Sequence, residues 1–333
     1  MRIDGSGWLY LLNQMWYLNL MSASAGVCDF WIGRRTAVSV TILLLFSICG
    51  CSVRRFAVNR LGDALAQSGT SIASDNDPDL IKDAAPFSLK LIESLLAEVP
   101  RHRALLTAAA SNFTQYTYAF VQLRADELED QDIQAATALR LRARRLYLRA
   151  RDFGLRGLEV KHPDFARQLK QNARQAVQAA RVKDVPLLYW TASAWALAIS
   201  VSKDQPEIVA DQPIVEALID RALELDEDFE SGAIHGFLIS YEMSRPGGSG
   251  DPAERARRHF ERALQLSGEM QASFFVSFAE SVSVTRQDRA EFEQLLNRAL
   301  AIDVERQPEW RLANLIMQRR ARWLLGRIDE LFL

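Results

Sequence analysis

The sequence predicts an all-α fold of tetratricopeptide-like helical hairpin repeats, an α-solenoid, from two observations. Between residues 214 and 303, three sets of apolar residues recur at i, i+4 and i+7, the spacing that marks one face of a helix. The sets are Val215, Ile219 and Ala222, then Ala256, Phe260 and Ala263, then Phe292, Leu296 and Ala299. Their last members lie 41 and 36 residues apart, close to the tetratricopeptide period of about 34 residues. In addition, no segment has the alternating β-branched pattern of a strand.

The N-terminal part of the chain has the features of an export signal. Residues 1–33 are rich in Trp, Tyr and Leu without a clear period, and Met21 offers a second translation start besides Met1. Arg34-Arg35 then precedes an uncharged stretch, residues 36–53, whose apolar part has signal-peptide length. As a helix with a rise of about 1.5 Å per residue, this stretch is marginally long enough to span a bilayer.

Cys51 is the candidate lipid-attachment residue. The apolar stretch ends in Ile48-Cys49-Gly50-Cys51-Ser52, where an aliphatic and then a small residue precede a cysteine, as in bacterial lipoprotein signals. From this pattern we expect a diacylglyceryl group on the Cys51 thiol. Two or more acyl chains would anchor the protein stably to the membrane. An uncleaved signal anchor is the alternative, and a twin-arginine signal at Arg34-Arg35 is a weaker one. Ser52 slightly favours the outer membrane over the inner.

Three regions follow from these features. Residues 1–50 are the N-terminal extension and signal, residues 51–79 the lipidated N-terminus and a polar spacer, and residues 80–333 the helical repeat domain. Asp77-Pro78 and Asp251-Pro252 each place an N-cap aspartate before a proline at the first helical position. Helices are expected at about 80–99, 104–128, 133–160, 165–181 and 186–200, in the repeat region, and from Arg311 onward. Residues 244–251, with three glycines and a proline, are expected to form an inserted loop.

Composition and spacing exclude several kinds of site. The 333 residues are 49% apolar with a net charge of −2, so the chain lacks the general positive field that binds nucleic acid. The Arg-rich residues 140–151 alternate with leucines and are expected to form a solvated helix face. No cysteine follows Cys51, and the four histidines have no second ligand at zinc-site spacing. Without a phosphate-binding loop or a nucleophile elbow, we predict no enzyme, cofactor or metal site.

Two groups of aromatic residues are candidates for lining a ligand cavity. Phe113 and Tyr116 lie three residues apart on one helical face, and Tyr189, Trp190 and Trp195 form the second group. Such side chains offer flat apolar surface with polar tips, which suits a cavity between helices. The alternative is that they are core residues, because helical hairpins bury aromatic side chains in any case.

Several motifs in order give the chain a family resemblance. Residues 75–333 resemble the TRAP transporter TatT component family, where TRAP denotes tripartite ATP-independent periplasmic. The motifs are Asp75-Asn-Asp-Pro-Asp-Leu-Ile-Lys-Asp-Ala-Ala-Pro-Phe87, Gln115-Tyr-Thr-Tyr-Ala-Phe120, Leu188-Tyr-Trp-Thr-Ala192, Gly247-Gly248 before Asp251, and Leu312-Ala-Asn-Leu-Ile-Met-Gln-Arg-Arg-Ala321. Several ordered motifs are together far more specific than any one of them.

The resemblance implies a periplasmic, lipid-anchored accessory protein of a TRAP transporter. It would bind or pass a small ligand, apolar in character, together with the solute-binding subunit, and it would assemble as a homotrimer without catalysing a reaction. A different class of function stays open: a tetratricopeptide adaptor that assembles cell-envelope proteins and binds no small molecule. Genes for a TRAP permease and a solute-binding protein beside this one would distinguish the two.

Overall fold

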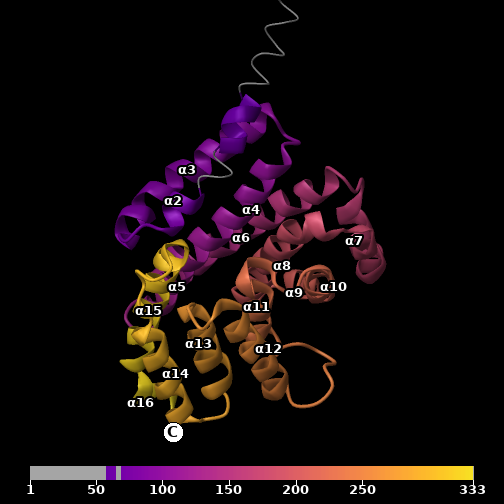
Figure 1. Cartoon of the computed structure of the whole chain (residues 1–333). Coiled ribbons are helices and arrows are strands. Elements are labelled where there is room, and N and C mark those ends of the chain that lie inside the picture. The colour runs from indigo at the N-terminus through magenta and orange to yellow at the C-terminus, as the bar shows by residue number, and fades with distance from the viewer. Residues whose placement is uncertain (1–57, 65–68, 333) are drawn as a thin grey trace, which may run out of the picture. The chain divides into compact units, whose positions relative to one another are not determined.

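The structure is a computed structural model that describes residues 58–64 and 69–332. Residues Asn59–Leu333 form one compact unit, and all the regular elements among the described residues are helices (Figure 1). The all-α prediction is confirmed, whereas the division into tetratricopeptide-like hairpins stays a prediction. The predicted signal, the alternative start and Cys51 lie outside the described residues. No helix in the described part of the chain combines the length and apolar character needed to cross a membrane.

The first half of the unit contains the longest helices, α3 and α6, together with shorter ones. These are α2 (Gly69–Ala73), α3 (Pro78–Glu98), α4 (Arg103–Thr117), α5 (Leu123–Leu128), α6 (Ile133–Glu159), α7 (Phe165–Ala176) and α8 (Val185–Ser200). A π-helical segment, η1 (Tyr118–Gln122), joins α4 to α5. The helix predicted at 104–128 is therefore continuous, with a π-helical turn inside it. The expected start at Asp77 is observed, because its carboxylate accepts hydrogen bonds from the backbone N–H groups of Asp79 and Leu80.

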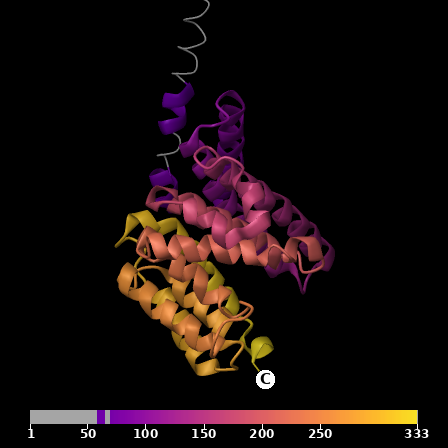
Figure 2. The same ribbon diagram turned by 90° about the vertical axis from the view of Figure 1, so that its right-hand side faces the viewer.

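The second half contains shorter helices. These are α9 (Pro206–Val209), α10 (Gln212–Leu225), α11 (Ala233–Tyr241), α12 (Pro252–Ser267), α13 (Ala272–Phe278), the π-helical η5 (Ala279–Ser283), α14 (Arg289–Ala301), α15 (Arg311–Leu325) and α16 (Ile328–Leu331). Asp251 caps α12 by accepting a hydrogen bond from the Ala253 N–H group. Residues 244–251, expected as an inserted loop, connect α11 to α12. In Figure 2 the orange and yellow helices of this half gather on one side of the magenta helices of the first half.

Two apolar clusters hold these helices together. One joins residues of α6, α7, α8, α10 and α11, and the other joins residues of α11 to α15, so α11 contributes to both. All nine residues of the three repeated sets in the sequence, which lie in α10, α12 and α14, are buried. Burial of a Leu, Ile, Val or Phe side chain contributes about 1.5–3 kcal/mol, so these repeated faces account for much of the driving force for packing.

Glycines on α6 allow a close approach to α8. A Cβ atom at Gly154 would overlap the Thr191 hydroxyl oxygen, and one at Gly157 would lie 2.5 Å from a Leu187 methyl group. Because Gly154 and Gly157 are three residues apart, they lie on the same face of α6. The missing side chains let α8 lie directly against the α6 backbone.

Helix α15 and the turn after it return to the start of the unit and contact it through three arginines, Arg311, Arg319 and Arg327. Arg311 donates a hydrogen bond to the backbone carbonyl of Ser74 at 2.7 Å. Arg327 pairs with Asp130, just after α5, at 2.6 Å, and Arg319 lies 3.6 Å from Glu127. Figure 1 shows α15 beside α5. Arginines in and just after α15 therefore link the last part of the unit to the segments around α2 and α5.

Candidate functional site

The five aromatic residues predicted to line a ligand cavity lie on two helices. Phe113 and Tyr116 are buried on α4, and Trp195 is buried on α8. The ring centroids of Phe113 and Phe153 are 5.7 Å apart, and the guanidinium of Arg151 lies 4.9 Å from the Trp195 ring. This burial is compatible with core packing, and a ligand-lining role for these residues stays a prediction.

Tyr189 and Trp190 on α8 are only partly buried and form a local cluster with the turn after α10. The Tyr189 ring lies 4.9 Å from Trp190 and 5.3 Å from Phe229, centroid to centroid. Glu230 adopts a left-handed backbone conformation with φ of 44°, which is strained for a residue with a side chain. Burial raises the pKa of the Glu230 carboxyl, and hydrogen bonding from Trp190 opposes part of that rise, although the residue as a whole is exposed. Among the described residues, no ring contact joins this cluster to Phe113 or Tyr116.

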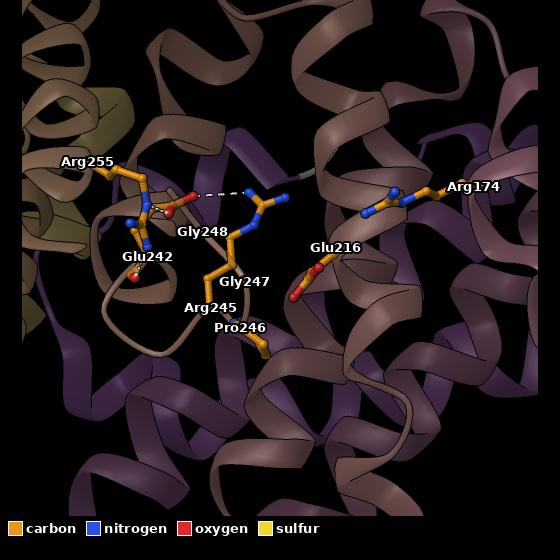
Figure 3. A pocket seen from close by; sticks show the side chains of 8 residues that line it. All are labelled: Arg174, Glu216, Glu242, Arg245, Pro246, Gly247, Gly248 and Arg255. Carbon is orange, nitrogen blue, oxygen red and sulfur yellow. Dashed lines mark hydrogen bonds and ion pairs between the residues drawn. The ribbon is translucent and has the colours of Figure 1, made fainter. Parts of the chain in front are cut away.

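The loop after α11 borders a polar cavity of about 230 Å³ (Figure 3). We call this cavity the loop pocket. Its lining comes from α7, α10, the end of α11, the loop and α12. The residues are Arg174, Glu216, Glu242, Arg245, Pro246, Gly247, Gly248 and Arg255. The sequence alone indicated only a turn here, without a binding role.

A buried carboxylate holds the loop pocket in shape. Glu242 is 3% exposed and accepts hydrogen bonds from Arg255 at 2.5 Å and from Arg245 at 3.0 Å. Burial alone would raise the pKa of Glu242, but these hydrogen bonds outweigh burial and hold the pKa below its usual range. Arg255 also donates to the loop carbonyls of Ser249 and Gly250 at 3.2 and 2.9 Å. The loop is therefore fixed by one arginine that is itself fixed by a buried acid.

Gly248 and a kink in α7 complete the walls of the loop pocket. A Cβ atom at Gly248 would lie 2.5 Å from an Arg255 nitrogen, so any side chain here would displace the arginine that fixes the loop. Helix α7 is interrupted at Asn172, whose φ and ψ are −157° and 92°. The Asn172 side chain accepts a hydrogen bond from the Gln175 N–H group at 3.1 Å and so restarts the helix. Arg174 lies on this restarted turn and lines the pocket.

A second polar site lies where α5 and the π-helical segment η5 approach α15. Arg320 on α15 is 6% exposed, pairs with Glu280 of η5, and lies 3.3 Å from the Asp126 carboxylate of α5. Its guanidinium carbon lies 4.2 Å from the centroid of the Trp323 ring. Burial raises the pKa of Asp126, against the opposing effect of Arg320. Because π-helical segments are rare and often occur at functional sites, we regard this network as the second candidate site.

The histidines have structural partners. His102 caps α4 by accepting a hydrogen bond from the Leu105 N–H group, and His162 contacts the buried Asp184 at 3.0 Å. His235 is buried and its Nδ1 atom lies 2.9 Å from Nδ1 of His259, so one ring donates to the other. No group of three metal-ligating side chains occurs in the part of the chain that the structure describes.

Comparison with known proteins places these features in a family. The family model described as TRAP transporter T-component matches residues 74–332, which includes both candidate sites. The chain belongs to this family. An uncharacterized protein of Treponema pallidum (strain Nichols) is 28% identical over 302 residues, covering 85% of this chain and 94% of its own length. The T-component match confirms the family resemblance drawn from the ordered motifs, and it assigns the chain an accessory role in a TRAP transporter.

Proposed function

We propose that the protein is a lipid-anchored periplasmic component of a TRAP transporter that binds or passes a small ligand together with the solute-binding subunit. The observation that carries this proposal is the T-component match, which extends over residues 74–332 and so over nearly the whole helical unit. As a transport component, the chain has a non-catalytic role. Both candidate sites are built from fixed side chains between packed helices, as expected of a protein that holds a ligand or a partner.

The aromatic residues support a ligand passage as part of this proposal. Tyr189 and Trp190 keep exposed surface on α8, and Phe113, Tyr116 and Trp195 lie deeper on α4 and α8.

A homotrimer would bury equivalent patches on each subunit and close without a free edge. Exposed apolar side chains such as Leu80 and Phe87 on α3 are candidates for such a contact.

The first test concerns the partner. The full chain, purified in detergent, is sedimented alone and with the cognate solute-binding subunit at on the order of tens of micromolar, the range of weak encounters. We expect a trimer alone and a heavier species in the mixture. A strictly monomeric protein that forms no mixed complex would contradict the transport role and favour the adaptor function, in which no solute-binding subunit is needed.

The second test concerns the membrane anchor. Cells that express the full chain are grown with radiolabelled palmitate, and we expect label in the wild type and its loss in Cys51→Ala. Cys49→Ala is the matched control, because it removes the neighbouring thiol and should keep the label. Equal labelling of the wild type and Cys51→Ala would reject lipid attachment at this residue.

A further inference from the structure

We propose that the loop pocket binds a small zwitterion, a molecule with both an ammonium and a carboxylate group such as a free amino acid. This inference concerns a binding site on the chain itself and does not depend on the transport role. It follows from how the charges of the pocket are paired, from the size of the cavity and from the way its walls are held.

Most of the charges around the pocket neutralise one another. Arg245 pairs with both Asp220 and Glu242, and Arg255 pairs with Glu242 and with loop carbonyls. Two cations thus meet two anions in one hydrogen-bonded network. These groups form the frame of the pocket and leave no net charge for a ligand.

Two charges remain, one of each sign. Arg174 and Glu216 line the pocket from α7 and α10, and neither forms an ion pair with the other or with any other described residue. Glu216 accepts only a long hydrogen bond, 3.4 Å, from the Tyr241 hydroxyl. In Figure 3 the Arg174 side chain extends toward Glu216 and Arg245 from the opposite side of the cavity. The pocket therefore presents one unpaired guanidinium and one unpaired carboxylate to whatever occupies it.

This charge pattern favours a zwitterion over a singly charged ligand. A simple carboxylate beside Arg174 would also face the negative Glu216, and a simple amine beside Glu216 would also face the positive Arg174. Like charges held close together disfavour binding, so each singly charged ligand meets a repulsive group. A molecule with both charges a few atoms apart matches both walls at once.

The dimensions and rigidity of the pocket fit a small ligand. Its volume of about 230 Å³ lies below the range of about 300–1,000 Å³ that is usual for sites of drug-sized ligands. Gly247 and Gly248 contribute backbone without side chains, which leaves this space open. Because Glu242 and Arg255 already fix the loop, little ordering is needed when a ligand binds, and less affinity is lost.

Equilibrium dialysis against a mixture of candidate ligands tests the proposal. The full chain in detergent is dialysed against an equimolar mixture of the proteinogenic amino acids at about 1 mM each, which suffices to detect weak binding. Mass spectrometry then measures the excess of each amino acid on the protein side. We expect one amino acid, or a few, to be enriched. Acetate and ethylammonium, each dialysed alone at the same concentration, should not be.

Variants of the two unpaired residues assign the binding to the loop pocket. Arg174→Met and Glu216→Gln should each weaken retention by about tenfold or more, equivalent to about 1.4 kcal/mol. The matched controls are Arg145→Met and Glu207→Gln, which change exposed residues on α6 and α9 and should retain the amino acid as the wild type does. Each variant is checked for a native circular dichroism spectrum and thermal midpoint.

Three outcomes would overturn the proposal. In the first, the wild type retains no amino acid. In the second, retention is unchanged in both Arg174→Met and Glu216→Gln. In the third, acetate or ethylammonium alone is retained as well as any amino acid, which would identify a simple ion site.

Discussion

Replacement of Arg320 by methionine is expected to destabilise the protein by about 1–3 kcal/mol, because two part-exposed carboxylates, Glu280 and Asp126, then lose the buried guanidinium that they share. Arg320 is 6% exposed and is paired with Glu280 and Asp126. Methionine keeps an unbranched apolar side chain against Trp323. The measured change in stability therefore reports mainly the removal of the charge. The free energy of unfolding in urea, measured on the full chain, gives the cost.

Arg322→Met is the control for this change. Arg322 lies on the same helix but is exposed, and surface substitutions usually change stability by no more than about 0.5 kcal/mol. The double variant Arg320→Met with Asp126→Asn should recover part of the loss, since it removes one of the two carboxylates that lose Arg320 as a partner. Equal stability of Arg320→Met and Arg322→Met would show that the network contributes little.

The pH dependence of the same variant gives an independent check. Burial raises the pKa of Asp126 in the folded protein, above the value of about 3.9 for an unfolded aspartate. The folded state therefore binds more protons between these two pKa values, and its stability falls as pH rises through the folded pKa. Arg320 opposes the rise in the pKa of Asp126, so Arg320→Met should raise that pKa further and extend the loss to higher pH. A difference between variant and wild type that is constant from acid to neutral pH would contradict this explanation.

The fold was largely predictable because its signals are local. Asp77 and Asp251 indicated helix starts that the structure shows with their capping hydrogen bonds. The repeated apolar sets predicted buried faces on α10, α12 and α14. Each of these signals depends on residues within about two helical turns, a range in which side-chain spacing decides the structure.

The candidate sites were less predictable because they join residues that are distant in the sequence. The loop after α11 was correctly expected as a break in the helices, but its binding surface depends on Arg174 and Glu216 from other helices. Asn172 gave a weak local signal for a helix start, since asparagine favours that position. It did not indicate the direction in which the kink would turn Arg174. Asp126, Glu280 and Arg320 are brought together only by the return of α15. No local pattern specifies such a contact.

The interpretation of the aromatic residues shows the same limit. Phe113 and Tyr116 share a helical face, and the sequence could not decide whether that face lined a cavity or a core. Burial depends on the neighbouring helices, and here α4 packs against both α6 and α8. Tyr189 and Trp190 are adjacent in the sequence and so point in different directions from α8, which leaves both rings partly exposed.

Replacement of Phe260 by alanine is expected to cost on the order of 3–5 kcal/mol, the range for removal of a fully packed phenylalanine from a core. Phe260 on α12 is 5% exposed, and its ring centroid lies 5.7 Å from that of Phe275 and 4.7 Å from that of Phe278, both on α13. Ile133→Ala is the matched control, because Ile133 is 58% exposed on α6 and its loss should change stability by no more than about 0.5 kcal/mol. Urea unfolding followed by far-ultraviolet circular dichroism measures both. A loss below about 1 kcal/mol for Phe260→Ala, against the several kcal/mol expected of a core phenylalanine, would show that α12 does not depend on this residue to pack against α13. The apolar repeat would then not be the feature that holds the last helices together.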